Sequence, residues 1–170
     1  MSLSQPERMR TALATLLIGA ALCAHAQDAT FSVRLMTAET ALAAARAALE
    51  NCRNAGYQVA VAVVDRSGVA QVMLRDRYAG PHTVEMAVDK AWTAVTFRTS
   101  TSALADATLS GKPQSGIRQR PRVAAVGGGL VIEGAGAMVG GIGVSGAPGG
   151  DRDEVCARAG IAAVQSQLDF

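Results

Sequence analysis

A glycine-rich run near the C-terminus constrains the fold of this chain more than any other feature. It extends over residues 127–147, and apolar residues return between its glycines. Glycine in a helix interior is unfavourable by about 1 kcal/mol relative to alanine, so a helix over this run is excluded. The return of apolar side chains argues against disorder. The run therefore predicts two short strands around a tight turn, over residues 130–133 and 137–145.

The rest of the chain alternates between helical and extended patterns. Apolar residues at helical spacing predict helices, and short apolar runs bounded by turn residues predict strands. The predicted helices cover residues 38–54, 80–97 and 102–109, with a last helix capped by Asp151. The further predicted strands cover residues 59–65, 69–75 and 123–126. Strand pairs joined by tight turns indicate an α+β fold, an antiparallel sheet with helices packed against it.

The first 26 residues have the pattern of a secretory signal peptide. Arg8 and Arg10 precede an apolar segment, residues 11–22, that is too short to span a bilayer as a helix. Ala24-His25-Ala26 has the A-x-A form of a cleavage site. We therefore expect a signal peptide over residues 1–26, a single domain over residues 27–170, and a periplasmic or secreted protein. An uncleaved N-terminal anchor is the alternative interpretation.

Charge and cysteine content narrow the class of protein further. A formal net charge of +2 over 170 residues argues against a nucleic-acid partner, and no later apolar segment is long enough to span a membrane. After the expected cleavage the chain keeps two cysteines, Cys52 and Cys156, and one histidine, His82. In an oxidising compartment the two cysteines either form a disulfide or stay buried as thiols. The many alanines and glycines suit a homo-oligomer with tightly packed subunit contacts.

Three segments in a fixed order carry a resemblance to a known family. They are the strand and turn at residues 61–68, the stretch 75–94, and the glycine run followed by residues 151–157. Together they resemble the GlcG/HbpS family of haem-binding proteins, which includes the C-terminal domain of PduO-type proteins. The resemblance covers the chain from about Val33 onward. One position departs from the family pattern, because Val131 stands where a proline usually follows the glycines.

The resemblance implies a fold, an assembly and a cofactor. The fold is profilin-like, with a five-stranded antiparallel sheet and helices on its faces, and the assembly is a homo-oligomer. Some members bind haem, and some secreted members degrade it or release its iron. The function expected from the resemblance is therefore haem uptake, scavenging or breakdown. Weak haem-dependent peroxidase or haem-degrading activity stays open.

If haem binds through an imidazole, His82 is the candidate iron ligand, because the expected mature chain has no other histidine. Met86 and Lys90 follow it on one face of the predicted helix. Tyr78 is a second candidate ligand, and Arg75 is a candidate partner for the haem propionates. Each has an ordinary alternative, as a surface histidine, core methionine, packing tyrosine or solvated arginine. Other axial ligands also stay open: Tyr57, Met73, Met138, Cys156 and Lys90.

A second hypothesis needs no haem. Asp65, Asp76 and Lys90 would form a polar cluster at one end of the sheet that binds or converts a small organic acid or aldehyde. An aromatic content of 4% favours this hypothesis mildly. The structural alternative is an ion pair plus a turn aspartate, and a purely structural oligomer is a third hypothesis. One histidine and two distant cysteines argue against structural zinc, and a glycine run followed by a strand is not a dinucleotide-binding motif.

Overall fold

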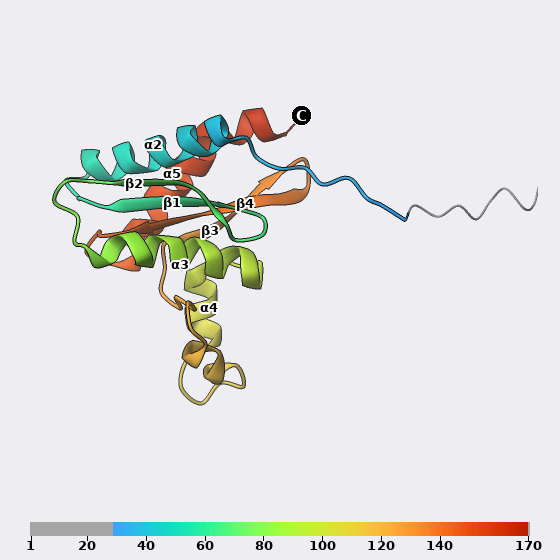
Figure 1. The fold of residues 1–170 in the computed structure, drawn as a ribbon. Helices are drawn as coiled ribbons and strands as arrows, with labels where there is room; N and C mark the ends of the chain where they lie inside the picture. The colour runs from blue at the N-terminus through green and yellow to red at the C-terminus, as the bar shows by residue number, and fades with distance from the viewer. Residues whose placement is uncertain (1–28, 170) are drawn as a thin grey trace, which may run out of the picture. The chain divides into compact units, whose positions relative to one another are not determined.

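A computed structural model of the chain describes residues 29–169. The expected signal peptide therefore lies outside the described residues. All helices and strands of this range belong to one compact unit that begins at Arg34 (Figure 1). In order they are α2 (Ala38–Asn54), β1 (Ala60–Asp65), β2 (Ala70–Arg75), α3 (His82–Phe97), α4 (Thr101–Ala107), the 3-10 helix η1 (Ser115–Gln119), β3 (Gly129–Gly134), β4 (Ala137–Ser145) and α5 (Gly150–Leu168). No helix within residues 29–169 is long and apolar enough to cross a membrane.

The strands of the described residues form one four-stranded antiparallel sheet, in the order β2-β1-β4-β3. The two central strands pair along their length, with Ala60 opposite Ser145 and Asp65 opposite Gly140. The predicted α+β fold with an antiparallel sheet is confirmed, but the expected number of five strands is wrong.

Residues 123–126, predicted as the additional strand, have no regular structure. The Val123 amide donates to the Arg120 carbonyl within a turn, at 3.2 Å. The Ala124 amide donates to the Thr93 hydroxyl of α3, at 3.0 Å. Because a turn and a helix side chain satisfy these amides, neither is left for a neighbouring strand.

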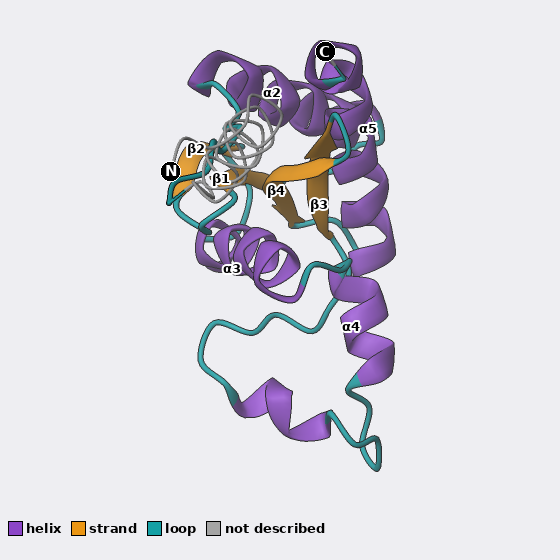
Figure 2. Cartoon of the chain, turned by 90° about the vertical axis from the view of Figure 1, so that its right-hand side faces the viewer, coloured by secondary structure: helices purple, strands orange, loops and turns teal. Residues whose placement is uncertain are grey.

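Helices cover both faces of the sheet, with α2 and α5 on one face and α3 on the other (Figure 2). Side chains of β1 alternate between them as a strand requires. Val61 and Val63 are buried with α2 and α5, whereas Ala60 and Ala62 are buried with α3. The apolar strand β1 is therefore covered on both faces.

Glycines in β4 let α3 lie directly on the sheet. A Cβ added to Gly143 would collide with the Ala87 carbonyl of α3, and one added to Gly141 would lie 2.7 Å from a Val95 methyl carbon. The backbone of the helix thus approaches the backbone of the strand without side chains between them. This contact fixes α3, whose first turns carry the predicted site residues.

The pair α2 and α5 is joined covalently. Cys52 and Cys156 form a disulfide with their Cα atoms 5.5 Å apart, which settles the alternative that the sequence left open. Helix α5 begins at Gly150 with Gly149 as its N-cap residue, which makes no side-chain cap. The expectation that Asp151 caps this helix is therefore wrong, because Asp151 lies inside the helix, two positions after the N-cap residue.

Candidate functional site

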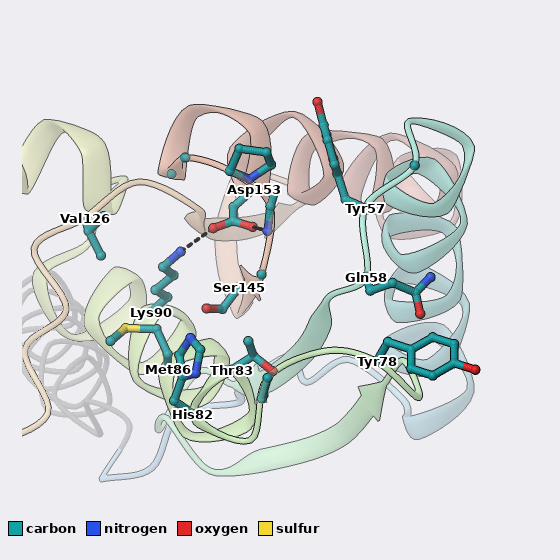
Figure 3. A pocket seen from close by; sticks show the side chains of 17 residues that line it. Tyr57, Gln58, Tyr78, His82, Thr83, Met86, Lys90, Val126, Ser145 and Asp153 are labelled. Atoms are coloured by element: carbon teal, nitrogen blue, oxygen red, sulfur yellow. Dashed lines mark hydrogen bonds and ion pairs between the residues drawn. The ribbon is translucent and has the colours of Figure 1, made fainter.

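A pocket of about 600 Å³ opens at the end of the sheet where β4 leads into α5 (Figure 3). Its lining comes from four parts of the chain: the α2–β1 loop at residues 56–58, the start of α3 with the residues before it, Val126, and residues 145–153. Segments distant in sequence therefore share one cavity. Its volume lies within the range of roughly 300–1,000 Å³ that small-molecule sites occupy.

Helix α3 contributes His82, Met86 and Lys90 to the pocket wall. The spacing of four residues places them on one face of the helix. Their exposure falls along the helix, since His82 is exposed, Met86 is 36% exposed and Lys90 is 2% exposed. The predicted residues of this helix are thus brought together in one wall, from the mouth of the pocket to its floor.

The imidazole of His82 is available to a ligand. Its ring packs over Gly80, where an added Cβ would lie 2.9 Å from Nδ1. Within residues 29–169 the side chain of His82 has no hydrogen bond or ion pair. Either ring nitrogen can therefore bind iron or donate a hydrogen bond without first breaking a contact within the described chain.

The floor of the pocket is a buried ion pair between Lys90 and Asp153. Lys90 Nζ lies 2.7 Å from Asp153 Oδ2 and 2.9 Å from the Val144 carbonyl oxygen. The other carboxylate oxygen of Asp153 accepts the Ala147 amide at 3.0 Å. The pair thus joins α3, the end of β4 and α5. Burial raises the pKa of the Asp153 carboxyl, and the nearby Lys90 charge and these hydrogen bonds oppose part of that rise.

Gly128 allows this pair to be covered closely. Its φ of +115° favours glycine, and an added Cβ would lie 2.7 Å from Asp153 Cβ and 2.8 Å from Lys90 Nζ. The glycine run therefore packs its backbone against the ion pair.

The two tyrosines of the pocket lie at its rim. Tyr78 is 79% exposed and Tyr57 is half-buried. Figure 3 shows both hydroxyls pointing away from the Lys90–Asp153 pair. Tyr78 is thus near the site, as expected, but its oxygen is not directed toward the floor.

Arg75 lies outside the pocket. Its guanidinium donates to the Ala79 carbonyl and so holds the turn that precedes α3. Arg118 and Arg122, in the segment between α4 and β3, also have partners within the chain. Arg118 donates to the Thr108 carbonyl, and Arg122 pairs with Asp89.

The polar cluster of the second hypothesis is not assembled. Asp65 accepts the amides of Ser67 and Val69 in the hairpin turn. Asp76 is buried, pairs with Arg53 and accepts the Val59 amide. Neither carboxylate lines the pocket with Lys90. The alternative of an ion pair plus a turn aspartate therefore describes Asp76 and Asp65 correctly.

The carboxylate that does reach Lys90 is Asp153, which sequence reasoning did not place in the site. Its place in the first turn of α5 suits the positive end of the helix dipole and by itself suggests no further role. An acidic residue in the first turn of a helix, directly after a glycine-rich loop, is the only local signal. That signal does not name a partner 63 residues away.

Comparison with known proteins identifies the family. The family model described as "Haem degrading protein HbpS-like" matches residues 36–162. The chain belongs to the HbpS-like family. This HbpS-like chain is 41% identical to a double mutant of HbpS from Streptomyces reticuli, with a TM-score of 0.75 over 82% of this chain and 94% of that one. It is 30% identical to PduOC in a complex with haem, with a TM-score of 0.71 over 76% of this chain and 95% of that one.

Among curated proteins the chain is similar to part of a larger enzyme. It is 34% identical to the corrinoid adenosyltransferase PduO of Salmonella typhimurium over 121 residues, which are 70% of this chain and 36% of PduO. The enzyme of the same name from Citrobacter freundii is 33% identical over 103 residues, 59% of this chain and 31% of that one. The HbpS-like chain thus spans about a third of the length of these relatives.

Proposed function

We propose that this protein binds haem in the pocket at the end of the sheet, with His82 as an axial ligand to the iron. The observation that carries the proposal is the imidazole of His82, exposed on the wall of a pocket of about 600 Å³ and free of hydrogen bonds within residues 29–169. Membership of the HbpS-like family and the similarity to PduOC in its haem complex support haem as the ligand.

The residues of the pocket fit a large, partly apolar ligand. Met86, Val126 and Pro148 supply apolar surface beside the histidine, and the ring of Tyr78 extends that surface at the rim. Lys90 is buried and paired with Asp153, so we assign it to the floor of the site rather than to a propionate. Arg75 does not line the pocket, so we assign the propionates to the open, solvated side. Bound haem would supply redox-active iron, and the chain would orient it and limit access of water.

The same proposal includes export from the cytoplasm. The charge, apolar and cleavage pattern of residues 1–26 supports it. The disulfide between Cys52 and Cys156 supports it independently, because disulfides persist mainly in oxidising compartments. In such a location haem uptake, scavenging and breakdown all begin with the same binding step. We also propose a homo-oligomer, in which a second copy would cover the exposed ring of Tyr78.

Haemin titration of the wild-type protein and His82→Ala tests the proposal. We expect the Soret absorbance of the wild type to saturate at a fixed ratio of haemin to chain, and His82→Ala to shift or abolish that band. Glu85→Ala is the matched control, since Glu85 is exposed on the same helix and does not line the pocket. Unsaturable absorbance that is identical in all three proteins would mean non-specific adsorption and would refute the proposal.

A second candidate function is binding of a small organic acid or aldehyde. The specific observation in its favour is the ammonium of Lys90 beside Asp153 on the floor of the pocket, an acid–base pair within reach of a small ligand. Thermal shifts with small carboxylates and aldehydes test this candidate. Stabilisation that competes with haemin would place such a ligand in the same pocket, and the absence of any shift would rule the candidate out.

A further inference from the structure

The disulfide lies next to two segments that line the pocket opposite α3, residues 56–58 and residues 146–150, which are called its two walls below. Cys52 is in the last turn of α2, and its carbonyl accepts the amide of Tyr57 at 2.9 Å. Tyr57 belongs to the α2–β1 loop, residues 56–58, which forms the first wall. Cys156 lies three residues after Asp153, one helical turn further into α5. Asp153 holds the second wall, residues 146–150, through the Ala147 amide.

The remainder of the contact between α2 and α5 needs no disulfide. A Cβ added to Gly160 would lie 2.6 Å from the Ala44 carbonyl oxygen and 3.0 Å from Ala48 Cβ, so the two helices touch closely there. Gly160 is one turn beyond Cys156, and Ala48 is one turn before Cys52, on the side away from the pocket. Close packing therefore fixes the far end of the helix pair, and the disulfide fixes the end that carries the walls.

We propose that the Cys52–Cys156 disulfide is a redox-sensitive clip that keeps the two walls of the pocket together, so that its reduction weakens ligand binding. The identity of the ligand rests on the proposed function, whereas the coupling between the disulfide and the walls does not. The reductant is a dithiol. One of its thiolates attacks a cysteine sulfur, a mixed disulfide forms, and the second thiol of the reductant resolves it. The two protein sulfurs gain two electrons and two protons, and the dithiol becomes a disulfide.

Coupling of this kind works in both directions. Both cysteines are buried, with at most 1% of their surface exposed, so a dithiol reaches them only when the pocket end of the helix pair opens. A ligand that holds the walls closed therefore protects the disulfide. Reduction, in turn, favours release of the ligand.

The first experiment measures, without any ligand, whether reduction of the disulfide loosens the two walls. Hydrogen exchange is measured by mass spectrometry on the oxidised protein and on the protein reduced with dithiothreitol, with thiol counting to confirm the redox state. We expect amides of residues 56–59 and 146–153 to exchange about tenfold faster after reduction, and those of β1 and β4 to be unchanged. Equal exchange at both walls in a fully reduced, folded protein would overturn the inference.

Haemin binding is tested on a variant, because dithiothreitol would also reduce the haemin iron. Cys52→Ala/Cys156→Ala removes the clip, and Cys52→Val/Cys156→Ala is a second version with more apolar volume if the first does not fold. We expect haemin affinity to fall about tenfold. Val164→Ala is the matched control, a truncation in the same buried core at the far end of α5 that should leave the affinity unchanged.

The outcomes separate the inference from the proposed function. If the intact protein does not saturate with haemin, the proposed function is refuted. The hydrogen-exchange measurement then still decides whether the disulfide is coupled to the walls. If the intact protein binds and the folded cysteine variants bind equally tightly, the clip is refuted and the function stands.

Discussion

Replacing Lys90 by methionine tests whether the ion pair holds the floor of the pocket together. Methionine is similar in length and apolar, so it fills the space of the lysine side chain without its charge. The change leaves Asp153 buried with the Ala147 amide as its remaining hydrogen-bond partner, and it removes the donor to the Val144 carbonyl. Removing one member of a buried pair destabilises a protein by about 3–5 kcal/mol. We expect a loss of that size in the free energy of unfolding at neutral pH.

The loss should depend on pH, and its sign follows from the Asp153 carboxyl. Burial raises its pKa above the usual value of 3.8, and Lys90 opposes that rise. Without Lys90 the pKa rises further, so the folded variant holds a proton that the unfolded chain has released. The stability of Lys90→Met is then greatest below pH 3.8 and falls as pH rises through the folded pKa, by up to about 1.4 kcal/mol per pH unit. The wild-type protein should show the same trend over a narrower window.

Urea unfolding followed by fluorescence of Trp92, the one tryptophan of the chain, measures these free energies between pH 4 and pH 8. Lys90→Met/Asp153→Leu is the matched double variant, since replacing a whole buried pair by apolar residues is often neutral or stabilising. We expect it to recover most of the stability lost in the single variant. Lys90→Met that unfolds like the wild type at pH 7, or that stops losing stability at the same pH as the wild type, would contradict this role of the ion pair.

Two further predictions address the sheet and the turn before α3. Gly143→Ala should lower the free energy of unfolding by about 1–3 kcal/mol in the same urea assay, because its Cβ would collide with the Ala87 carbonyl of α3; a variant as stable as the wild type would show that the helix can move off the strand. Arg75→Ala should leave haemin affinity unchanged while lowering stability by about 1 kcal/mol through the lost bond to Ala79; a large loss of affinity would instead restore Arg75 as a propionate partner.

Local sequence patterns were sufficient for most elements of this fold. The helix over residues 38–54 and the strand over residues 137–145 have the predicted bounds, because periodicity and flanking turn residues act within a few positions. The strand predicted over residues 123–126 is absent because its amides are bonded in part by a residue far away in the sequence. Its amides are satisfied by a turn and by Thr93, about thirty residues earlier, and no local pattern contains that partner.

The candidate site likewise contains residues that local patterns predict and residues that only the packing of the elements brings in. His82, Met86 and Lys90 share a wall because helical spacing alone places them there. Asp153 joins them only through the packing of α3 and α5 around the end of β4, so no local pattern favours it over Asp65 or Asp76. The disulfide was left open on similar grounds, because the distance between Cys52 and Cys156 depends on how closely α2 and α5 approach.

The glycines of residues 127–147 allow the close packing that assembles the floor of the pocket. Gly141 and Gly143 let α3 rest on the backbone of β4, which brings Lys90 to the end of that strand. Gly128 then lets the preceding loop pack against the ion pair, where a larger side chain would meet Lys90 Nζ and Asp153. The run that predicts strands from its sequence pattern thus also determines how deeply the floor of the pocket is buried. Because a Cβ at Gly128 would collide with both members of the pair, Gly128→Ala should displace the ion pair and so change the burial that raises the pKa of Asp153.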